Sequence, residues 1–375
     1  MRYAYFFFIG FLFIASSAYA QFALLPPAGM TAKNPLYIFE RAFESIGTLF
    51  TFGRESKIER LIMLAEERLS EAVVLSYEKH PKTNETIVRF GAHMEKAAEQ
   101  VDRSNNPELA STVLRSLAKH FAVFEEILDG VSEQMRVGIE SAFEEDRNLQ
   151  KRLLFEVAGD RPLHASELGF LSLRERLAKL KIEVDRGRQY ETSIITSHIK
   201  DIFDVVASAV LREEAPSTEF LFLLSNDITR TLESFDEIER SPKYPSGETG
   251  ETISALKAGF IDLQISVSRG MIPVDPQFVV RIIQEGAQSR VSAFDRASGA
   301  KETVLILLLR EYETYALFAE EVSNRTGRFM LDREEGITVA DELERLQEKY
   351  RAQISAKRDL FSTQVRSEMD RIFSQ

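Results

Sequence analysis

Apolar side chains recur at helical spacing along almost the whole chain. Intervals of three and four residues between apolar positions run through segments 58–73, 87–101, 110–128, 131–153, 170–209, 220–238, 253–267, 279–294 and 300–324. This spacing places the apolar residues on one face of an α-helix. We find almost no strand signal, because short alternating runs of β-branched residues bounded by hairpin dipeptides are absent. The pattern predicts an all-α protein.

Capping residues mark several helix boundaries. Asn34-Pro35 and Asn106-Pro107 each place an N-cap residue before a proline at the first helical position. Ser217 follows Pro216 and is expected to cap the next helix. Thr338 with Asp341 reads as a capping box that opens a last helix, in register through residue 373. These signals predict where helices begin.

The longest helical pattern starts at Ser166 and reaches Arg212. If continuous, it forms a helix of about 70 Å at the α-helical rise, and Gly187 is the position at which it could be broken. Glycine and proline predict loops at 158–166, 241–250 and 270–276. Long helices joined by short loops predict elongated bundles of antiparallel helices. Near-heptad spacing leaves an intermolecular coiled coil open, although stripes widened by Phe and Ala favour an intramolecular core.

The first twenty residues have the layout of a secretory signal peptide. Arg2 precedes the apolar run at 6–14, and Ala18 and Ala20 stand before Gln21 in an A-x-A pattern. We therefore predict a cleaved signal peptide at 1–20, a linker at 21–33, an N-terminal helical domain at 34–158 and a long-helix domain at 166–375. The alternative is an uncleaved anchor, although a spanning helix needs about 20 apolar residues. We expect the protein to be periplasmic, on the cell surface or extracellular.

Composition excludes several function classes. The chain has no Cys, which excludes disulfides, thiolate metal sites and a cysteine nucleophile. Its 47 basic and 59 acidic residues give a net charge of −12, which argues against nucleic acid as a partner. With 44% hydrophobic and 28% charged residues, the chain is typical of a folded globular protein.

No motif identifies a catalytic or binding centre. The residue three positions before each of the five histidines is never acidic, so the Glu-x-x-His di-iron pattern is missing. His164 with Glu167 and His198 with Asp201 could each share a metal, but such isolated pairs are more often hydrogen bonds on a helix face. The glycine-dense stretch 246–250 lacks the preceding strand that a phosphate loop requires, and reads as a turn. We assign no catalytic, cofactor-binding or metal-binding residue and expect no cofactor.

One block near the N-terminus resembles a known family. It consists of PLYIFER at 35–41, LFTF at 49–52 and LAEERLSEA at 64–72. This block resembles a family of exported bacterial helical domains of unknown function, over residues 33–78. The resemblance implies export and a helical fold, with no assigned activity. Within it we expect Tyr37 and Phe39 to pack against Phe50 and Phe52, with the charged residues 66–68 on the solvated side.

These observations favour an exported, non-enzymatic helical protein that acts as a scaffold, a spacer or a protein-interaction module. Its expected partner is another envelope or surface protein, or a second copy bound through the long helices. The alternative is a helical sensor or carrier that encloses a small apolar ligand, and its motivation is a group of phenylalanines in the N-terminal half: Phe90, Phe121, Phe124, Phe143 and Phe155. A third possibility is a hydrolase without a familiar motif, since 59 acidic residues offer many carboxylate pairs.

Overall fold

The computed structural model describes residues 25–28, 31, 33, 37, 51–102, 106–128, 131, 133–213, 216–296, 302–326, 328–332 and 336–374. The predicted signal segment lies outside these ranges. So does the helix predicted after Asn34, except for Tyr37.

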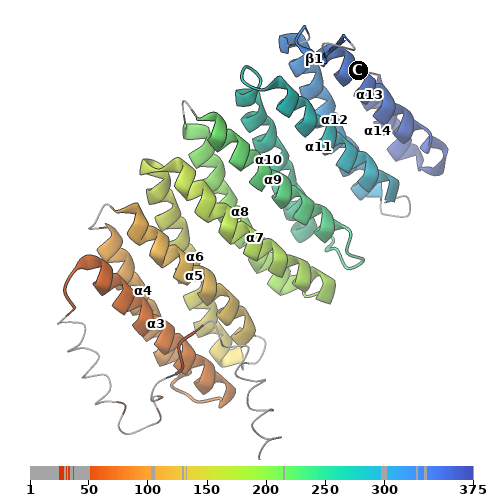
Figure 1. Cartoon of the computed structure of the whole chain (residues 1–375). Coiled ribbons are helices and arrows are strands. Elements are labelled where there is room, and N and C mark those ends of the chain that lie inside the picture. The colour runs from red at the N-terminus through yellow and green to blue at the C-terminus, as the bar shows by residue number, and fades with distance from the viewer. Residues whose placement is uncertain are drawn as a thin grey trace, which may run out of the picture. The chain divides into compact units, whose positions relative to one another are not determined.

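The described chain is helical apart from two short strands, which confirms the all-α prediction (Figure 1). Its elements are α3 Arg54–Tyr77, α4 Thr83–Asp102, α5 Pro107–Leu128, α6 Glu133–Asp160, α7 Pro162–Arg186, α8 Gln189–Arg212, α9 Thr218–Glu239, α10 Glu248–Met271, α11 Pro276–Arg296, α12 Glu302–Thr326, β1 Met330–Asp332, β2 Ile337–Thr338, α13 Val339–Ser355, η2 Arg358–Leu360 and α14 Thr363–Phe373. The chain divides into two compact units. Unit 1 comprises residues 1–172 and 208–210, and unit 2 comprises 173–207 and 211–375.

Unit 1 is built on two helical pairs, α3 with α4 and α5 with α6, with further contacts between α4 and α6 (Figure 1). Its core contains a cluster of phenylalanine rings packed edge to face. The centroids of Phe90 and Phe124 are 5.4 Å apart, and those of Phe121 and Phe143 are 5.3 Å apart. Edge-to-face packing lets the positive ring edge meet the negative ring face, so these rings fill the core closely.

Unit 2 repeats the pairing with α9 against α10 and α11 against α12, and α13 packs on both α11 and α12. One close approach depends on a glycine. A Cβ added at Gly286 of α11 would lie 2.3 Å from the ring of Tyr315 on α12, so only glycine fits there. Tyr315 is fully buried and donates its hydroxyl hydrogen to Gln264 Oε1 at 2.6 Å. This contact fixes α11 and α12 against α10.

Three predicted caps are confirmed. Asn106 Oδ1 accepts the backbone N–H of Glu108, and Ser217 Oγ accepts that of Phe220. Thr338 and Asp341 form a reciprocal capping box at the start of α13. In each case a side-chain oxygen satisfies a backbone donor that the first helical turn leaves unpaired.

The long pattern at 166–212 forms two helices instead of one. Gly187 adopts φ +77° and donates its N–H to the carbonyl of Val184, while the N–H of Arg188 bonds the carbonyl of Glu183. This is the Schellman arrangement that ends a helix at a left-handed glycine. The first helix, α7, also begins earlier than predicted, at Pro162, so Arg161 alone separates it from α6.

The single helix predicted from Thr338 through residue 373 also forms two helices. It ends at Ser355, and a new helix, α14, begins after Ser362, whose hydroxyl accepts the N–H of Val365. Between them Phe361 leaves the helical path and packs on Phe294, with ring centroids 4.8 Å apart.

Two further expectations need correction. Almost no strand was expected, but β1 and β2 pair antiparallel ahead of α13. The loops predicted at 241–250 and 270–276 are shorter, because α10 extends from Glu248 to Met271. The predicted domain boundaries stay predictions.

Within the residues that the structure describes, no helix combines the length and the apolar character needed to cross a bilayer.

Candidate functional site

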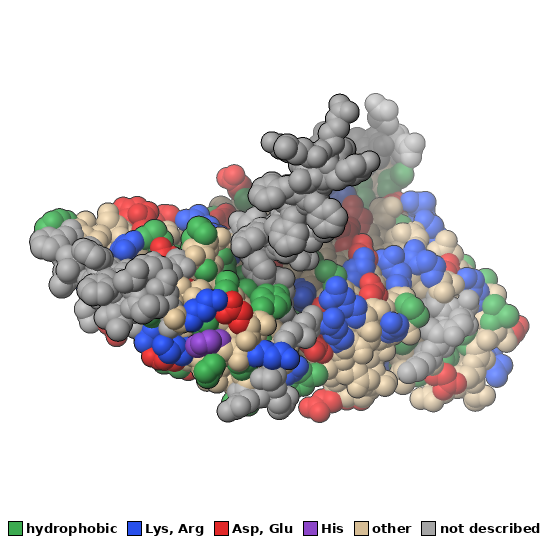
Figure 2. Space-filling view, turned by 90° about the horizontal axis from the view of Figure 1, so that it is seen from below, with side chains coloured by type: hydrophobic (Ala, Val, Ile, Leu, Met, Phe, Trp, Pro, Cys, Tyr) green, Lys and Arg blue, Asp and Glu red, His purple; other side chains and the backbone are tan. Residues whose placement is uncertain are grey.

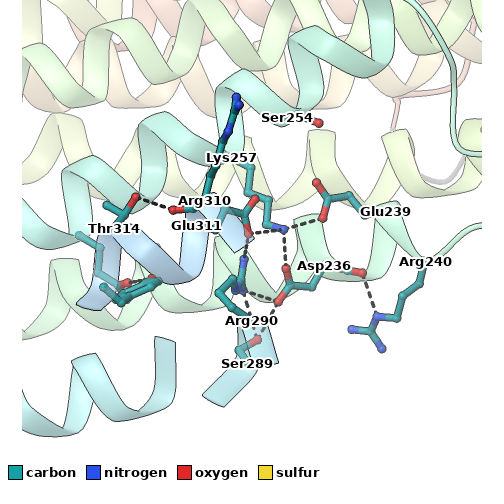
Figure 3. A network of polar contacts seen from close by, with 12 residues as sticks. Asp236, Glu239, Arg240, Ser254, Lys257, Ser289, Arg290, Arg310, Glu311 and Thr314 are labelled. Atoms are coloured by element: carbon teal, nitrogen blue, oxygen red, sulfur yellow. Dashed lines mark hydrogen bonds and ion pairs between the residues drawn. The ribbon is translucent and has the colours of Figure 1, made fainter. Parts of the chain in front are cut away.

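Five charged side chains meet inside unit 2 and form what we call the ion cluster. Asp236 and Glu239 come from α9, and the other three come from one helix each: Lys257 from α10, Arg290 from α11 and Glu311 from α12 (Figure 3). The Lys257 side chain is 0% exposed and that of Arg290 is 3% exposed. Buried charges persist only when they are paired and hydrogen-bonded, so this cluster ties four helices together.

Lys257 is the centre of the ion cluster. Its Nζ lies 3.0 Å from Asp236 Oδ1, 2.5 Å from Glu239 Oε2 and 3.0 Å from Glu311 Oε2. An ammonium group has three N–H donors, and here three carboxylates surround it.

Arg290 joins two of the same carboxylates from the other side. Its Nη2 lies 2.5 Å from Asp236 Oδ2, and its Nη1 donates to Glu311 Oε2 at 2.8 Å. Ser289 adds a hydroxyl donor to Asp236 Oδ2 at 2.9 Å. Asp236 and Glu311 therefore each contact both cations, whereas Glu239 contacts only Lys257.

This difference in contacts separates the pKa values of two neighbouring acids. Burial raises the pKa of Glu239 to about 7, since the opposing effect of Lys257 is smaller and the nearby Glu311 adds to the rise. Burial acts on Asp236 as well, but Lys257 and Arg290 together hold its pKa below the ordinary value. With all five groups ionised, three negative and two positive charges leave a net charge of −1.

A cavity of about 760 Å³ opens beside the ion cluster. Asp236 and Glu239 form one part of its wall, and the α12 side chains Val304, Leu307 and Leu308 form an apolar part. The segment between α9 and α10 contributes Ser241, Pro242, Tyr244, Pro245, Ser246 and Gly247. A cavity of this size, with an apolar wall and a few polar groups, is typical of small-molecule sites.

The loop that borders the cavity is held in a defined conformation. The Tyr244 hydroxyl donates to the carbonyl of Gly250 at 3.0 Å and lies 3.1 Å from Ser254 Oγ. A Cβ at Gly250 would lie 2.3 Å from the carbonyl oxygen of Pro245, and Gly247 adopts φ +75°. Both glycines are therefore needed for the turn that the sequence predicts here.

Unit 1 contains a second buried polar group, which we call the serine–histidine chain. Ser116 Oγ lies 3.1 Å from His120 Nε2, and His120 Nδ1 lies 3.2 Å from Asp146 Oδ2. All three residues are at most 4% exposed. Ser116 and His120 are one turn apart on α5, and Asp146 is on α6. Serine, histidine and aspartate in this order occur in hydrolases, so the arrangement needs a test.

The serine hydrogen is directed away from the histidine. Ser116 Oγ donates to Glu66 Oε1 at 2.9 Å, and a hydroxyl has only one hydrogen to give. His120 Nε2 therefore carries a hydrogen and donates it to Ser116 Oγ. The contact between His120 Nδ1 and Asp146 Oδ2 requires a second proton. Burial raises the pKa of Asp146, which favours retention of that proton. The imidazole cannot accept the serine proton in this state. The serine–histidine chain therefore has the features of a structural network rather than of an activated nucleophile.

Neither of the two histidine–carboxylate pairs noted in the sequence gains a third metal ligand among the described residues. His164 Nδ1 is 3.4 Å from Glu167 Oε2, and its Nε2 is 2.6 Å from Ser111 Oγ. His198 lies 1% exposed in α8. Among the described residues, no three His, Asp or Glu side chains gather as metal ligands would.

The phenylalanines that suggested an apolar ligand pack on one another instead. Phe90, Phe121, Phe124 and Phe143 are at most 4% exposed and form the edge-to-face cluster of unit 1, while Phe155 is 50% exposed. The apolar-ligand alternative therefore loses the residues on which it rested.

The packing predicted for the N-terminal block is partly wrong. Phe52 is 84% exposed, and Phe39 and Phe50 lie outside the described residues. Arg68, predicted on the solvated side, is 1% exposed. It pairs with Glu71 Oε1 at 2.8 Å and donates to the hydroxyl of Tyr37, so the helix turns this charge inward.

The ion cluster was not identified from the sequence, although it leaves a signal there. Lys257 stands within the apolar stripe formed by Ile253, Phe260 and Ile261 on α10. Arg290 occupies the corresponding position between Ala287 and Phe294 on α11. A charged residue inside a buried stripe requires a partner. Opposite charges at such positions on several helices could have suggested the cluster.

Comparisons with known proteins identify a fold but no activity. The model of a domain of unknown function (DUF5667) matches residues 29–135, which agrees with the resemblance to a family without assigned function. A solved structure described as a circular tandem repeat protein with novel repeat topology and enhanced subunit contact surfaces is similar, with a TM-score of 0.60 and 14% identity. The match covers 89% of this chain and 74% of that one. No curated protein matches the chain.

Proposed function

We propose that this chain is an exported, non-enzymatic module of paired helices that binds another protein at the bacterial envelope or cell surface. A domain of unknown function and a helical repeat-like fold fit a scaffold or interaction module. The signal-peptide layout of residues 1–20 supports export.

The observation that carries this proposal is a group of exposed apolar side chains at one end of unit 2, which we call the apolar end. It consists of Phe222, Leu223, Val274, Phe329 and Met330, whose exposed fractions range from 39% to 55%. Large apolar side chains exposed together mark interaction surfaces.

Contacts between neighbouring elements bring these residues near one another. The ring of Phe222 lies 5.1 Å from that of Phe278, one turn after Val274. Gln277 donates from its side chain to the carbonyl of Leu331, next to Met330, at 3.2 Å. Figure 2 shows one face of the molecule, on which Lys and Arg side chains lie among Asp and Glu side chains, with small apolar groups between them. Such a mixed face favours protein partners over a polyanion.

The proposal is tested in a bacterium that produces the full chain. Photo-crosslinking phenylalanine analogues are placed at Phe222 and Phe329, with a control at the exposed Glu344. We expect a discrete crosslinked product at both apolar positions and none at 344, and a mature N-terminus at Gln21 in the exported fraction. Mass spectrometry of the product distinguishes a second copy from another protein. Equal labelling at all three positions, or none, would overturn the interaction proposal.

A further inference from the structure

The cavity next to the ion cluster has an acidic wall and an apolar wall, and the scaffold function does not require either. We propose that it is a binding site for a small organic cation, namely a primary ammonium group carried on a compact apolar body. The wall chemistry, the charge of the ion cluster and an open carboxylate oxygen support this assignment independently of the interaction proposal.

The charged part of the wall favours a cation. Asp236, Glu239 and Glu251 line the cavity together with Arg240 and Arg296, so the lining carries one more acid than base, whereas Lys257 lies behind them with no exposed surface. Glu239 directs Oε2 to Lys257, and Oε1 receives no hydrogen bond from any described residue. An ammonium ligand could donate to this open oxygen and bring the charge of the ion cluster from −1 to zero.

The shape of the lining favours an organic cation over a metal ion. Hard divalent ions such as Ca²⁺ need six to eight oxygen ligands, and Glu239 offers one open oxygen. Ser254 and the hydroxyl of Tyr244 are already bonded to each other. Opposite them the apolar side chains of Val304, Leu307 and Leu308 can cover a hydrocarbon body, and Leu307 still has 36% of its surface exposed. A ligand with one ammonium and one apolar part fits both walls.

Binding should depend on pH, because a proton competes for the same carboxylate. Burial raises the pKa of Glu239 to about 7, so the group is increasingly protonated below neutrality. The charged and titratable groups that face Glu239 or the cavity from neighbouring elements are Asp236 on α9, Arg240 and Tyr244 in the loop, Glu251 and Lys257 on α10, Arg290 and Arg296 on α11, and Glu311 on α12. A primary ammonium stays charged in this range, as a lysine does. Affinity is expected to fall about tenfold for each pH unit below 7.

The first arm of the test uses 2-phenylethylammonium as the probe and isothermal titration of the full mature chain at pH 8. Its neutral counterpart, 2-phenylethanol, has a similar shape without the charge. We expect saturable binding of the ammonium compound at least tenfold tighter than that of the alcohol, and a loss of affinity toward pH 6. Equal binding of the two compounds, or no saturable binding, would overturn the proposal.

The second arm uses variants. Glu239→Gln removes the carboxylate and should weaken binding at least tenfold and abolish its pH dependence, whereas Glu233→Gln, on the exposed face of α9, should bind as the parent chain does. Leu307→Trp fills the cavity from its exposed side without touching the ion cluster, and should also weaken binding. It keeps the proposal testable if Glu239→Gln fails to fold, which circular dichroism reveals.

Unchanged binding in folded Glu239→Gln or in Leu307→Trp would overturn the site assignment. Loss of ligand binding would leave crosslinking at the apolar end unaffected, so the two proposals fail separately.

Discussion

The two buried polar networks of this protein solve the same problem in different ways. In unit 1, Glu66, Ser116, His120 and Asp146 form a linear chain joined by three hydrogen bonds. In unit 2, the ion cluster joins five charged side chains, with three carboxylates on Lys257, and leaves one carboxylate oxygen open toward a cavity. A chain whose serine hydrogen is already given to a carboxylate stabilises a core, whereas a charged cluster with an open carboxylate oxygen beside a cavity can bind a ligand. The comparison therefore assigns a structural role to the first and a ligand-binding role to the second.

The largest effect should come from removing the central cation. Lys257→Met leaves Asp236 and Glu311 with Arg290 alone and removes the cation that Glu239 contacts, and breaking a buried pair in this way typically costs about 3–5 kcal/mol. We expect the free energy of unfolding, measured with urea, to fall by that amount. The control is Lys200→Met, since Lys200 is 58% exposed and pairs only with Asp204. That change should stay within about 0.5 kcal/mol, as exposed ion pairs contribute little. A similar loss in both variants would mean that Lys257 is not specially placed.

The next effect is a pH dependence that belongs to Glu239. Its pKa is raised from 4.5 to about 7, so the folded state holds a proton that the unfolded state has released between these values. The contribution of Glu239 to stability is therefore greatest below pH 4.5 and declines as the pH rises toward 7, by at most about 1.4 kcal/mol per pH unit.

Glu239→Gln should remove this decline, because an amide does not titrate. The unfolding free energies of the two proteins are expected to run together near pH 4.5 and to separate toward pH 7, with the variant more stable. Other acids, such as Asp146, affect both proteins alike, and Glu233→Gln is the control that should follow the parent chain. Parallel curves for the parent and Glu239→Gln would show that folding does not raise the pKa of Glu239.

The sequence was sufficient for the fold class and for several caps, because both depend on local patterns. Helical spacing identifies most helices, and Asn106, Ser217 and Thr338 act where predicted. It was insufficient where tertiary contacts decide. The apolar register continues past Ser355, but Phe361 packs on Phe294 outside any helix. Arg68 lies on a charged stretch of sequence and is nevertheless buried by its contacts with Glu71 and Tyr37.

The candidate site could not be predicted from the sequence for a related reason. Its five charged residues come from four helices spread over 75 positions, and no short motif connects them. Each one is a single polar interruption in an apolar stripe, which by itself predicts only that some partner exists. Which partner it meets depends on how α9, α10, α11 and α12 pack, and this is not encoded in local spacing.

The smallest expected effect concerns the serine–histidine chain of unit 1. Asp146→Leu removes the group that faces His120 Nδ1 and leaves a buried polar atom without its partner, at a cost of about 1–3 kcal/mol. Asp146→Asn keeps a hydrogen-bonding group of the same size and should cost less.

The double change His120→Leu with Asp146→Leu removes both partners. It should cost less than the two single changes added together, because paired polar groups replaced by apolar ones leave nothing unsatisfied. Strict additivity of the two changes in urea unfolding would mean that the contact at 3.2 Å contributes no coupling. The ion cluster allows no such two-residue replacement, since each of its three acids contacts Lys257.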